Sequence, residues 1–475
     1  MPIRHGVNVS EKTTSVSTPV VAPSGIPFVI GASPIQSAES PAKLGIPQLC
    51  SSYEEFVTAF GYSDDWTKYN LCEAAYSHFK LYGCQPIIFV NLLDPETMNS
   101  SQAAADIDVV NHRAELPLEA INDDNLVVKT SGGTGTAYTK DTDYAVFYSG
   151  EHCYVELLAG THYSETALNI AYKKATPGSV TAAVVSQNMD TMELCLSAIG
   201  TVPDLIIAPS YSESNLVSAV MATKAAGING LFRAKAIIDI DSSNASGAVR
   251  AYTGVAAYKT ANNLTDENEI LCWPMAKLGD KIFHLSVQVA GLMAQVDSVN
   301  ECPYESPSNK NFKMDTLVLQ DGTIVNQTKA QADTINGAGV VTALNFMASG
   351  WVCWGNYTAC YPSNTDVKDY FIPVSRMFDW VANTLIQTFW SKLDQPMNRR
   401  LIDTILDSSN IWLNGLTGRG FLLGARAEML EAENPLTDLM QGIVRIHLYM
   451  TPPSPAQEID FVLEYDVNYV ESALE

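Results

Sequence analysis

The stretch LCEAAYSHFKLYGCQPIIFV, residues 71–90, predicts a helix followed by a buried strand. Its first part repeats apolar or small side chains every three or four residues, which produces one apolar face of an α-helix. Gly83 suits the end of that helix, because glycine readily takes the left-handed conformation that terminates helices. Residues 87–90 are continuously apolar, as is typical of strands in a parallel sheet covered on both faces. The stretch therefore indicates an α/β domain.

The same alternation recurs on both sides of this stretch. Further short apolar strands are expected at 28–31, 205–208, 236–239 and 270–273. Helical periodicity is found at 192–199, 216–221 and 282–296. The sequence therefore predicts a doubly wound, mainly parallel α/β core formed by residues 21–95 and 186–355.

Residues 96–185 interrupt the core pattern with short strands and many turns. Within them, the apolar segments 144–148 and 153–157 flank Ser149-Gly150-Glu151 and predict a hairpin. Several short strands at this spacing are typical of a β-sandwich. We expect residues 96–185 to form an inserted β-sandwich domain.

Residues 356–455 predict an α+β C-terminal domain. Apolar residues share a helical face over 377–389, and Pro396 is expected to open a second helix, where proline is favourable. A strand follows, in which apolar side chains alternate with Arg445, His447 and Tyr449; its apolar members are Val444, Ile446, Leu448 and Met450.

The two ends of the chain are expected to be extended arms. Residues 1–20 are rich in Val, Ser and Thr without a helical period. Residues 456–475 follow a proline-rich tether and alternate strictly between apolar and mostly acidic positions. The apolar positions are Ile459, Phe461, Leu463, Tyr465, Val467 and Tyr469. Such a strand either completes a local sheet or pairs with another chain, and the pattern alone leaves both open.

Composition narrows the possible functions. Lys and Arg number 28 against 52 Asp and Glu, so the net charge of -24 argues against binding to nucleic-acid phosphates. Charged residues make up 17 %, against roughly 25 % in an average soluble protein. This fits a chain that buries surface against copies of itself, and it also fits many monomers. No apolar run approaches the roughly 20 residues of a membrane span, and direct membrane insertion is not expected.

The nine cysteines are scattered without a CxxC pair, which indicates reduced thiols in a cytoplasm. The start of the chain lacks the apolar segment of a secretory signal. Both observations disfavour a second hypothesis, a secreted β-sandwich adhesin.

An α/β core also permits an enzyme, which would carry a catalytic sequence pattern. Neither GxSxG nor HExxH occurs, although a dispersed histidine–serine–aspartate site is still possible. Asp239 and Asp241 follow a predicted strand and could hold a divalent cation, or simply begin a turn with Ser242. A hydrolase would lose turnover on mutation of Asp239 or His284. The glycines at 132–135 lack the lysine and helix of a phosphate loop and predict a hairpin loop.

A basic cluster stands out in this acidic chain. Its members are Lys392, Arg399, Arg400, Arg419 and Arg426. The cluster is either a set of solvated helix faces or a docking surface for an acidic partner.

Several segments together resemble the contractile tail sheath proteins of bacteriophages and related phage-tail bacteriocins. They are, in chain order, Thr18-Pro19-Val20-Val21-Ala22-Pro23-Ser24-Gly25-Ile26-Pro27, Ser52-Tyr53-Glu54-Glu55-Phe56 with Phe60-Gly61, Asn336-Gly337-Ala338-Gly339-Val340-Val341-Thr342, Trp354-Gly355-Asn356-Tyr357-Thr358-Ala359, Lys368-Asp369, Arg376-Met377, Glu433-Asn434-Pro435-Leu436-Thr437-Asp438, Tyr449-Met450-Thr451-Pro452-Pro453-Ser454-Pro455 and Glu458-Ile459. Their order and spacing span nearly the whole chain. One departure is Val340, where isoleucine is usual.

The resemblance implies a subtilisin-like core without protease residues, and hence no enzymatic activity, cofactor or metal. It implies terminal arms that exchange strands between subunits, through Val7, Val9 and Val16 at one end and the alternating apolar residues at the other. The acceptor strand would carry Val444, Ile446 and Leu448, and Arg419 and Arg426 would face an inner tube.

The implied partners are copies of the chain in stacked hexameric rings, an inner tail tube, and baseplate and tail-terminator proteins. Such a particle is made in a bacterial cytoplasm, and contraction of its sheath drives the tube through a cell envelope. Phage tail, bacteriocin and other contractile injection systems remain alternatives.

Overall fold

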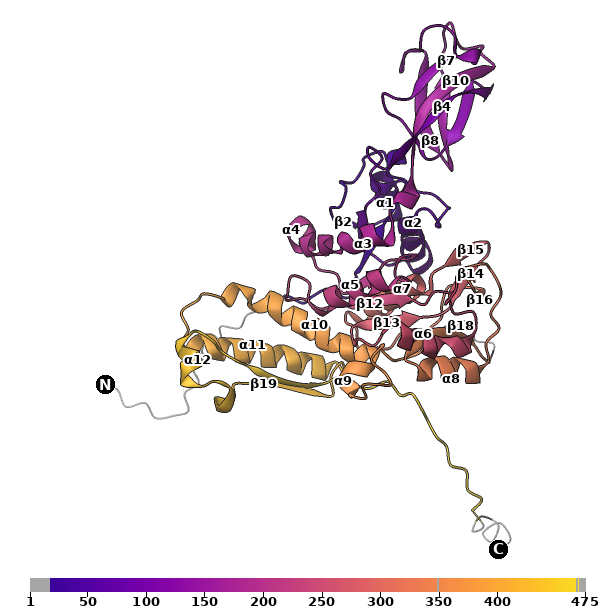
Figure 1. Ribbon diagram of the computed structural model, residues 1–475. Helices are drawn as coiled ribbons and strands as arrows, with labels where there is room; N and C mark the ends of the chain where they lie inside the picture. Colours follow the sequence, from indigo (N-terminus) through magenta and orange to yellow (C-terminus); the bar gives the residue numbers. More distant parts are fainter. Residues whose placement is uncertain (1–17, 348–349, 467–468, 470–475) are drawn as a thin grey trace, which may run out of the picture.

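The computed structural model describes residues 18–347, 350–466 and 469 (Figure 1). A central α/β core carries a small β domain at one end and an elongated helical region at its side, and the C-terminal segment leaves the body as a long extension. None of the described helices is both long and apolar enough to cross a membrane.

The core is an eight-stranded sheet in the order β18-β17-β13-β12-β11-β1-β3-β2. Its strands are β1 (Pro27–Gly31), β2 (Gln48–Cys50), β3 (Ile87–Asn91), β11 (Leu205–Ile207), β12 (Lys235–Asp239), β13 (Glu269–Cys272), β17 (Val340–Asn345) and β18 (Trp351–Trp354). The inner neighbours are parallel, and only the two edge strands, β2 and β18, run antiparallel. The continuously apolar segments occupy the inner strands and are buried on both faces, which the sequence predicted.

Helices cover this sheet. They are α1 (Tyr53–Phe60), α2 (Asn70–Ala75), α3 (Ala182–Gln187), α4 (Cys195–Ile199), α5 (Asn215–Ala226), α6 (Val255–Ala261), α7 (Leu285–Asn300) and α8 (Lys329–Gly337). The helix expected from residue 71 continues beyond α2 as a π-helical segment, Tyr76–Tyr82. It ends at Gly83 with φ 64°, the left-handed cap that the sequence indicated.

A small antiparallel sheet, β15-β14-β16, lies beside the core. Its strands are β14 (Met275–Leu278), β15 (Lys281–Phe283) and β16 (Thr316–Val318).

The interrupting segment forms a separate seven-stranded sheet with its own apolar core. Its strands are β4 (Asn99–Val110), β5 (Arg113–Pro117), β6 (Ala120–Ile121), β7 (Val127–Thr130), β8 (Tyr144–Ser149), β9 (His152–Leu157) and β10 (Ala167–Ala175). The hairpin predicted around Gly150 is confirmed, because β8 and β9 pair antiparallel up to Ser149 and His152. After the loop at Gly132 the chain folds back on β7, where the Tyr138 N–H donates to the Val128 carbonyl. The other edge of β7 pairs with β10, and the Gly132 N–H donates to Asp106.

The C-terminal region is built from two long helices and a two-stranded sheet. Its elements are α9 (Val367–Tyr370), α10 (Ile372–Phe389), α11 (Arg399–Gly418), β19 (Gly424–Glu428), α12 (Leu436–Met440) and β20 (His447–Thr451). Pro396 does not open α11; Asn398 caps that helix, with its side-chain oxygen accepting from the Leu401 N–H at 3.0 Å.

The strand expected from Val444 starts three residues later, so Val444 and Ile446 precede β20. The reason is the buried Asn434 side chain, which accepts from the Arg445 N–H (2.7 Å) and donates to the Arg445 carbonyl (2.8 Å). These two bonds occupy backbone groups that would otherwise join a strand ladder.

The alternating terminal segment is not a strand of a local sheet. Residues 452–466 have no regular structure and extend away from the body (Figure 1). Phe461 and Leu463 are 85 % and 94 % exposed, so the apolar side of the pattern has no partner surface within the described part of its own chain.

Candidate interaction site at the root of the C-terminal arm

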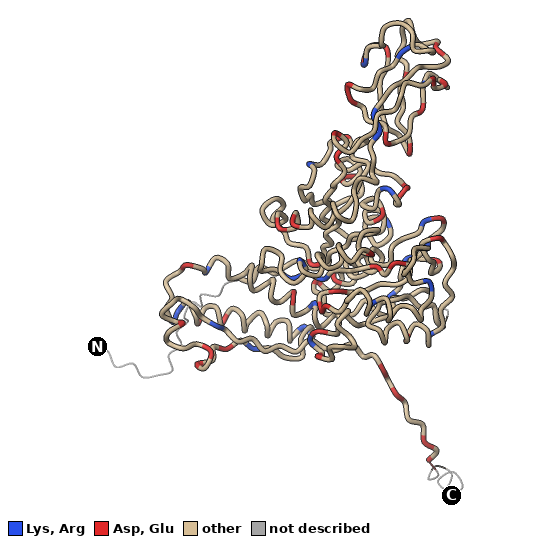
Figure 2. The backbone as a smooth tube through the Cα atoms, in the orientation of Figure 1, with Lys and Arg blue, Asp and Glu red and all other residues tan. Residues whose placement is uncertain are grey.

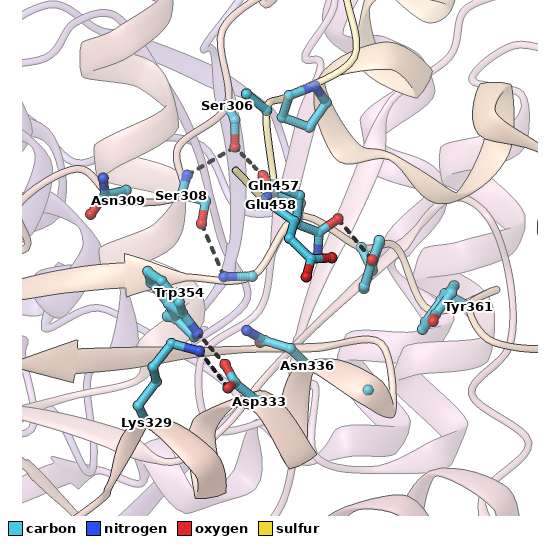
Figure 3. Close-up of a pocket in the computed structure, with 16 residues that line it drawn as sticks. Ser306, Ser308, Asn309, Lys329, Asp333, Asn336, Trp354, Tyr361, Gln457 and Glu458 are labelled. Carbon is cyan, nitrogen blue, oxygen red and sulfur yellow. Dashed lines mark hydrogen bonds and ion pairs between the residues drawn. The ribbon is translucent and has the colours of Figure 1, made fainter. Parts of the chain in front are cut away.

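A groove of about 630 Å³ lies where the C-terminal segment leaves the body (Figure 3). Helix α8 and the end of β18 form one wall, and the loop around Ser306 and Ser308 forms another. Residues 455–458 line the groove as well, so the root of the arm is part of this site. In Figure 3, Gln457 and Glu458 project into the space between these walls.

Short-range contacts fix the wall formed by α8. Lys329 and Asp333 lie one helical turn apart and form an ion pair at 2.6 Å. The Trp354 Nε1–H donates to Asp333 at 3.2 Å, which joins the end of β18 to the helix.

The motifs quoted for the sheath resemblance meet at this wall. With its amide oriented to satisfy both groups, Asn336 donates to the carbonyl oxygens of Val340 (2.8 Å) and Trp354 (2.9 Å). Gly355 has φ 145°, and a Cβ there would lie 2.9 Å from the Asn336 amide and 3.1 Å from the Val341 Cα. The asparagine and glycine of these motifs are therefore explained by close packing around the groove.

An aromatic cluster holds the arm on the opposite side. Tyr357 stacks on Tyr361 with ring centroids 4.0 Å apart and also contacts Tyr370 and Phe371. Its hydroxyl donates to the Gln457 side-chain oxygen at 2.8 Å, a contact between residues 100 positions apart. Burial raises the pKa of Tyr357, so the hydroxyl stays protonated at neutral pH and remains a donor.

The two-stranded sheet of the C-terminal region is a candidate acceptor for an added strand. β19 and β20 pair antiparallel, with Ala427 opposite Leu448, and in the described chain they have no further strand neighbour. A two-stranded sheet is only marginally stable by itself, and unpaired strand edges readily accept another strand. Leu448 lies in β20, whereas Val444 and Ile446 lie just before it.

The residues predicted for strand exchange lie on the extended arm. Ile459, Phe461, Leu463, Tyr465 and Tyr469 are all more than two-thirds exposed. Figure 2 shows acidic residues along the same arm, which are the alternate positions of the pattern. Val7, Val9, Val16 and Val467 fall outside the described residues.

The five basic residues do not form one cluster. Arg399 and Arg400 begin α11, whereas Arg419 follows its other end, about 30 Å away at 1.5 Å per residue. Arg419 pairs with Glu301 at 2.8 Å and lies over Phe421. Arg426 lies over Tyr449 and 3.6 Å from Glu428. The last two arginines are surface side chains with partners in their own chain.

A buried polar cluster at the carboxyl edge of the core sheet is the alternative site. His284 precedes α7 and is 6 % exposed; its Nδ1 lies 2.8 Å from Glu73, which is 1 % exposed. The His284 Nε2 faces Ser210, 3.1 Å from the backbone nitrogen and 3.4 Å from Oγ. Asp239 accepts from Ser286 and Ser212. Sequence reasoning identified Asp239 and His284 but missed Glu73 and Ser210, which no local motif marks.

This cluster resembles a catalytic triad in composition, but its hydrogen bonds do not suit that chemistry. Burial alone would lower the pKa of His284, but the carboxylates of Glu73, Asp239 and Glu213 raise it to about 10. A charged imidazole has no lone pair with which to deprotonate Ser210. In the neutral form, the Nε2 lone pair would accept the Ser210 N–H. In the charged form the imidazole has no lone pair to act as a general base, and in the neutral form that lone pair is engaged by the Ser210 N–H.

The ligand position usual in doubly wound sheets is also filled. Such sheets bind ligands where the strand order reverses, which here lies beyond the ends of β1 and β11. The Asn70 side chain occupies this position, donating to the carbonyls of Ile30 and Pro209 and accepting from the Ala32 N–H. A Cβ on Gly31 would lie 2.1 Å from Asn70. The described residues also contain no group of three or more His, Cys, Asp or Glu side chains that could hold a metal ion.

The chain has relatives among tail sheath proteins along almost its whole length. It is 28 % identical to the tail sheath protein of Burkholderia phage BcepMu over 98 % of this chain and 97 % of the relative. It is 26 % identical to the tail sheath protein of Escherichia phage P2 over 43 % of this chain and 51 % of the relative. No family model matches the sequence.

Solved sheath structures have the same fold. The sheath complex of the extracellular contractile injection system PVC, in its contracted state, superposes with a TM-score of 0.60 at 13 % identity, covering 99 % of both chains. The contracted helical sheath of the anti-feeding prophage gives 0.59 at 14 % identity, covering 98 % of this chain and all of the other. The relationship to contractile tail sheath proteins that the sequence predicted is confirmed, and these relatives are structural proteins rather than enzymes.

Proposed function

We propose that this chain is the structural, non-enzymatic subunit of a contractile tail sheath. The observation that carries the proposal is the exposed segment after residue 458, whose sequence alternates between apolar and mostly acidic positions, in a chain related along its length to a phage tail sheath protein. A strand with one apolar side gains its stability from a surface that covers that side. A neighbouring subunit supplies such a surface in a polymer.

The exchange joins the arm of one subunit to the small sheet of another. Ile459, Phe461, Leu463, Tyr465, Val467 and Tyr469 would lay their apolar side chains against the acceptor. Leu448 lies on the acceptor strand β20, and Val444 and Ile446 would join it if the arm extended the ladder. Val7, Val9 and Val16 of the N-terminal arm would pair in the same way. Backbone pairing then keeps subunits connected while other contacts change.

Contraction needs no nucleotide in this scheme. Copies of the chain would stack as six-membered rings around an inner tail tube, between a baseplate and a terminator protein. The core would have a subtilisin-like topology without catalytic function, and Arg419 and Arg426 would face the tube. Release from the baseplate would let subunits move as near-rigid bodies into a packing of lower free energy, which drives the tube through a cell envelope.

The same subunit would serve a phage tail, a bacteriocin or another contractile injection system. The β domain that interrupts the core would lie on the outside of the sheath, where its removal leaves assembly intact. The particle would be assembled in a bacterial cytoplasm.

Electron microscopy of two purified proteins tests the proposal. The full chain is expected to form tubes at high concentration, alone or on tail tube and baseplate templates. A chain ending at Glu458 is expected to stay dispersed under the same conditions and to unfold at the same temperature as the full chain. Tubes formed equally well by the shortened chain would refute the role of the arm.

A further inference from the structure

The segment that joins β20 to the arm, residues 453–458, lines two neighbouring cavities. On one side is the groove of about 630 Å³ described above. On the other is a hollow of about 320 Å³, lined by the loop at 304–310 and by Pro373. Ser306 and Ser308 line both spaces, and so do residues 455 and 456 of the joining segment. The joining segment, residues 453–458, therefore lies as a strap between two cavities.

Few groups can hold this strap in place. Pro453 and Pro455 have no backbone N–H to donate, and the preceding Pro452 is buried as an anchor. The side chain of Gln457 makes the contact with Tyr357 described above. Beyond it, every described residue of the arm is exposed.

The partner of the strap is rigid. Tyr357 forms a β-bridge with Phe371, the residue immediately before α10, and its ring is stacked on Tyr361. The position of its hydroxyl is therefore set by the body of the subunit. A large change in the course of the strap breaks the bond to this hydroxyl, whereas the Gln457 side chain can follow a small one.

We propose that the Tyr357–Gln457 hydrogen bond is a latch that fixes the direction in which the C-terminal arm leaves the subunit, and that the groove is a second seat for the strap. When this hydrogen bond breaks, the strap moves into the larger cavity, the groove, where Glu458 forms an ion pair with Lys329. In Figure 3 the Glu458 side chain already projects into the groove whose opposite wall carries Lys329. Lys329 there pairs with Asp333 and can share its charge with a second carboxylate.

The latch gives the proposed sheath a hinge with two positions. This consequence rests on the proposed function, whereas the latch itself is a property of the single chain. An arm held by a neighbour must change its angle to the body when subunits rotate. A strap with two seats changes that angle without unfolding the acceptor sheet.

Distance measurement between two spin labels tests the latch in the full-length protein below the concentration at which it polymerises. All nine native cysteines are buried, so Asp460→Cys on the arm and Thr365→Cys on the body provide the label sites. The parent is expected to give one main distance. Q457L and Y357F are each expected to add a second population, and the double variant to add no more than either one.

Matched variants separate the latch from general loosening. Y370F, in the same aromatic cluster, and S454A, on the strap, are expected to keep the parent distribution. K329A added to Q457L is expected to remove the second population and leave a broad one. Unchanged distributions in both Q457L and Y357F would overturn the latch, and so would an equal change in Y370F. Assembly of the same proteins in the microscope then shows separately whether the sheath function stands.

Discussion

The α/β core and the C-terminal arm differ in where their side chains find interaction partners. In the core, charged groups find partners inside the chain: the guanidinium of Arg376 on α10 is buried against Asp297 of α7 and lies 2.8 Å from Asp204. On the arm, apolar side chains that a fold would normally bury point into solvent. The core therefore satisfies its charged groups within one chain, whereas the arm and the two-stranded sheet are the parts that, under the proposed function, neighbouring subunits would complete.

Substitution of Arg376 is the strongest test of the conclusion that contacts within one chain stabilise the core. Asp204 also accepts the backbone N–H groups of Gly25 and Ile26, so one ionic group ties the entry of β1, helix α7 and helix α10 together. In the sequence Arg376 is only one member of a motif, and its role as a buried counter-ion becomes visible in the structure.

R376M is expected to lower the free energy of unfolding by about 3–5 kcal/mol, because it leaves a buried carboxylate without its counter-ion. Urea unfolding of the dispersed protein measures this loss. R399M is the matched control, since the Arg399 side chain is 92 % exposed and its substitution should change stability by less than about 0.5 kcal/mol. Equal stability of R376M and the parent would show that the core does not depend on this ion pair.

Substitutions at two neighbouring arm residues test whether one face of the arm becomes buried on assembly. Leu463 and Val462 are 94 % and 92 % exposed but lie on opposite faces of the alternating pattern. L463D is expected to raise the protein concentration needed for assembly about 10-fold or more, because burial of a leucine contributes roughly 1.5–3 kcal/mol. V462D is expected to have a much smaller effect. Sedimentation of assembled material against concentration gives both values.

Neither substitution is expected to shift the unfolding temperature of the dispersed chain. Equal effects of the two on assembly would show that the arm does not bind as a strand with one buried face. An effect on unfolding temperature would show that the arm packs on its own subunit.

The sequence predicted the buried strands well because continuous apolar runs are a local signal. Local signals also marked the arm, whose period of two is visible without any structure. They failed at Val444, because the side chain that caps the neighbouring backbone, Asn434, comes from a separate turn. They could not show the pairing of Glu73 with His284 either, since 211 positions separate the two residues. Contacts of this kind depend on the assembled sheet, whereas periodicity depends only on neighbours in the chain.

The smallest expected effect concerns Glu213, at the edge of the buried polar cluster. Burial raises the pKa of Glu213; the charge of His284 opposes this, and Asp239, Asp241 and Glu73 add to it, with a result of about 7 against an ordinary 4.5. Because the folded state holds this proton more tightly than the unfolded state, the contribution of Glu213 to stability is fully present below pH 4.5 and is lost as pH rises through about 7. E213Q cannot ionise, so its stability relative to the parent is expected to rise between pH 5 and pH 8. Urea unfolding at the two pH values measures the change, and the exposed E39Q serves as control. A stability difference between E213Q and the parent that does not change with pH would show that the core tolerates the Glu213 charge. The contrast between a core whose charged groups are paired and an arm whose apolar groups are exposed would then depend on Arg376 and His284 alone.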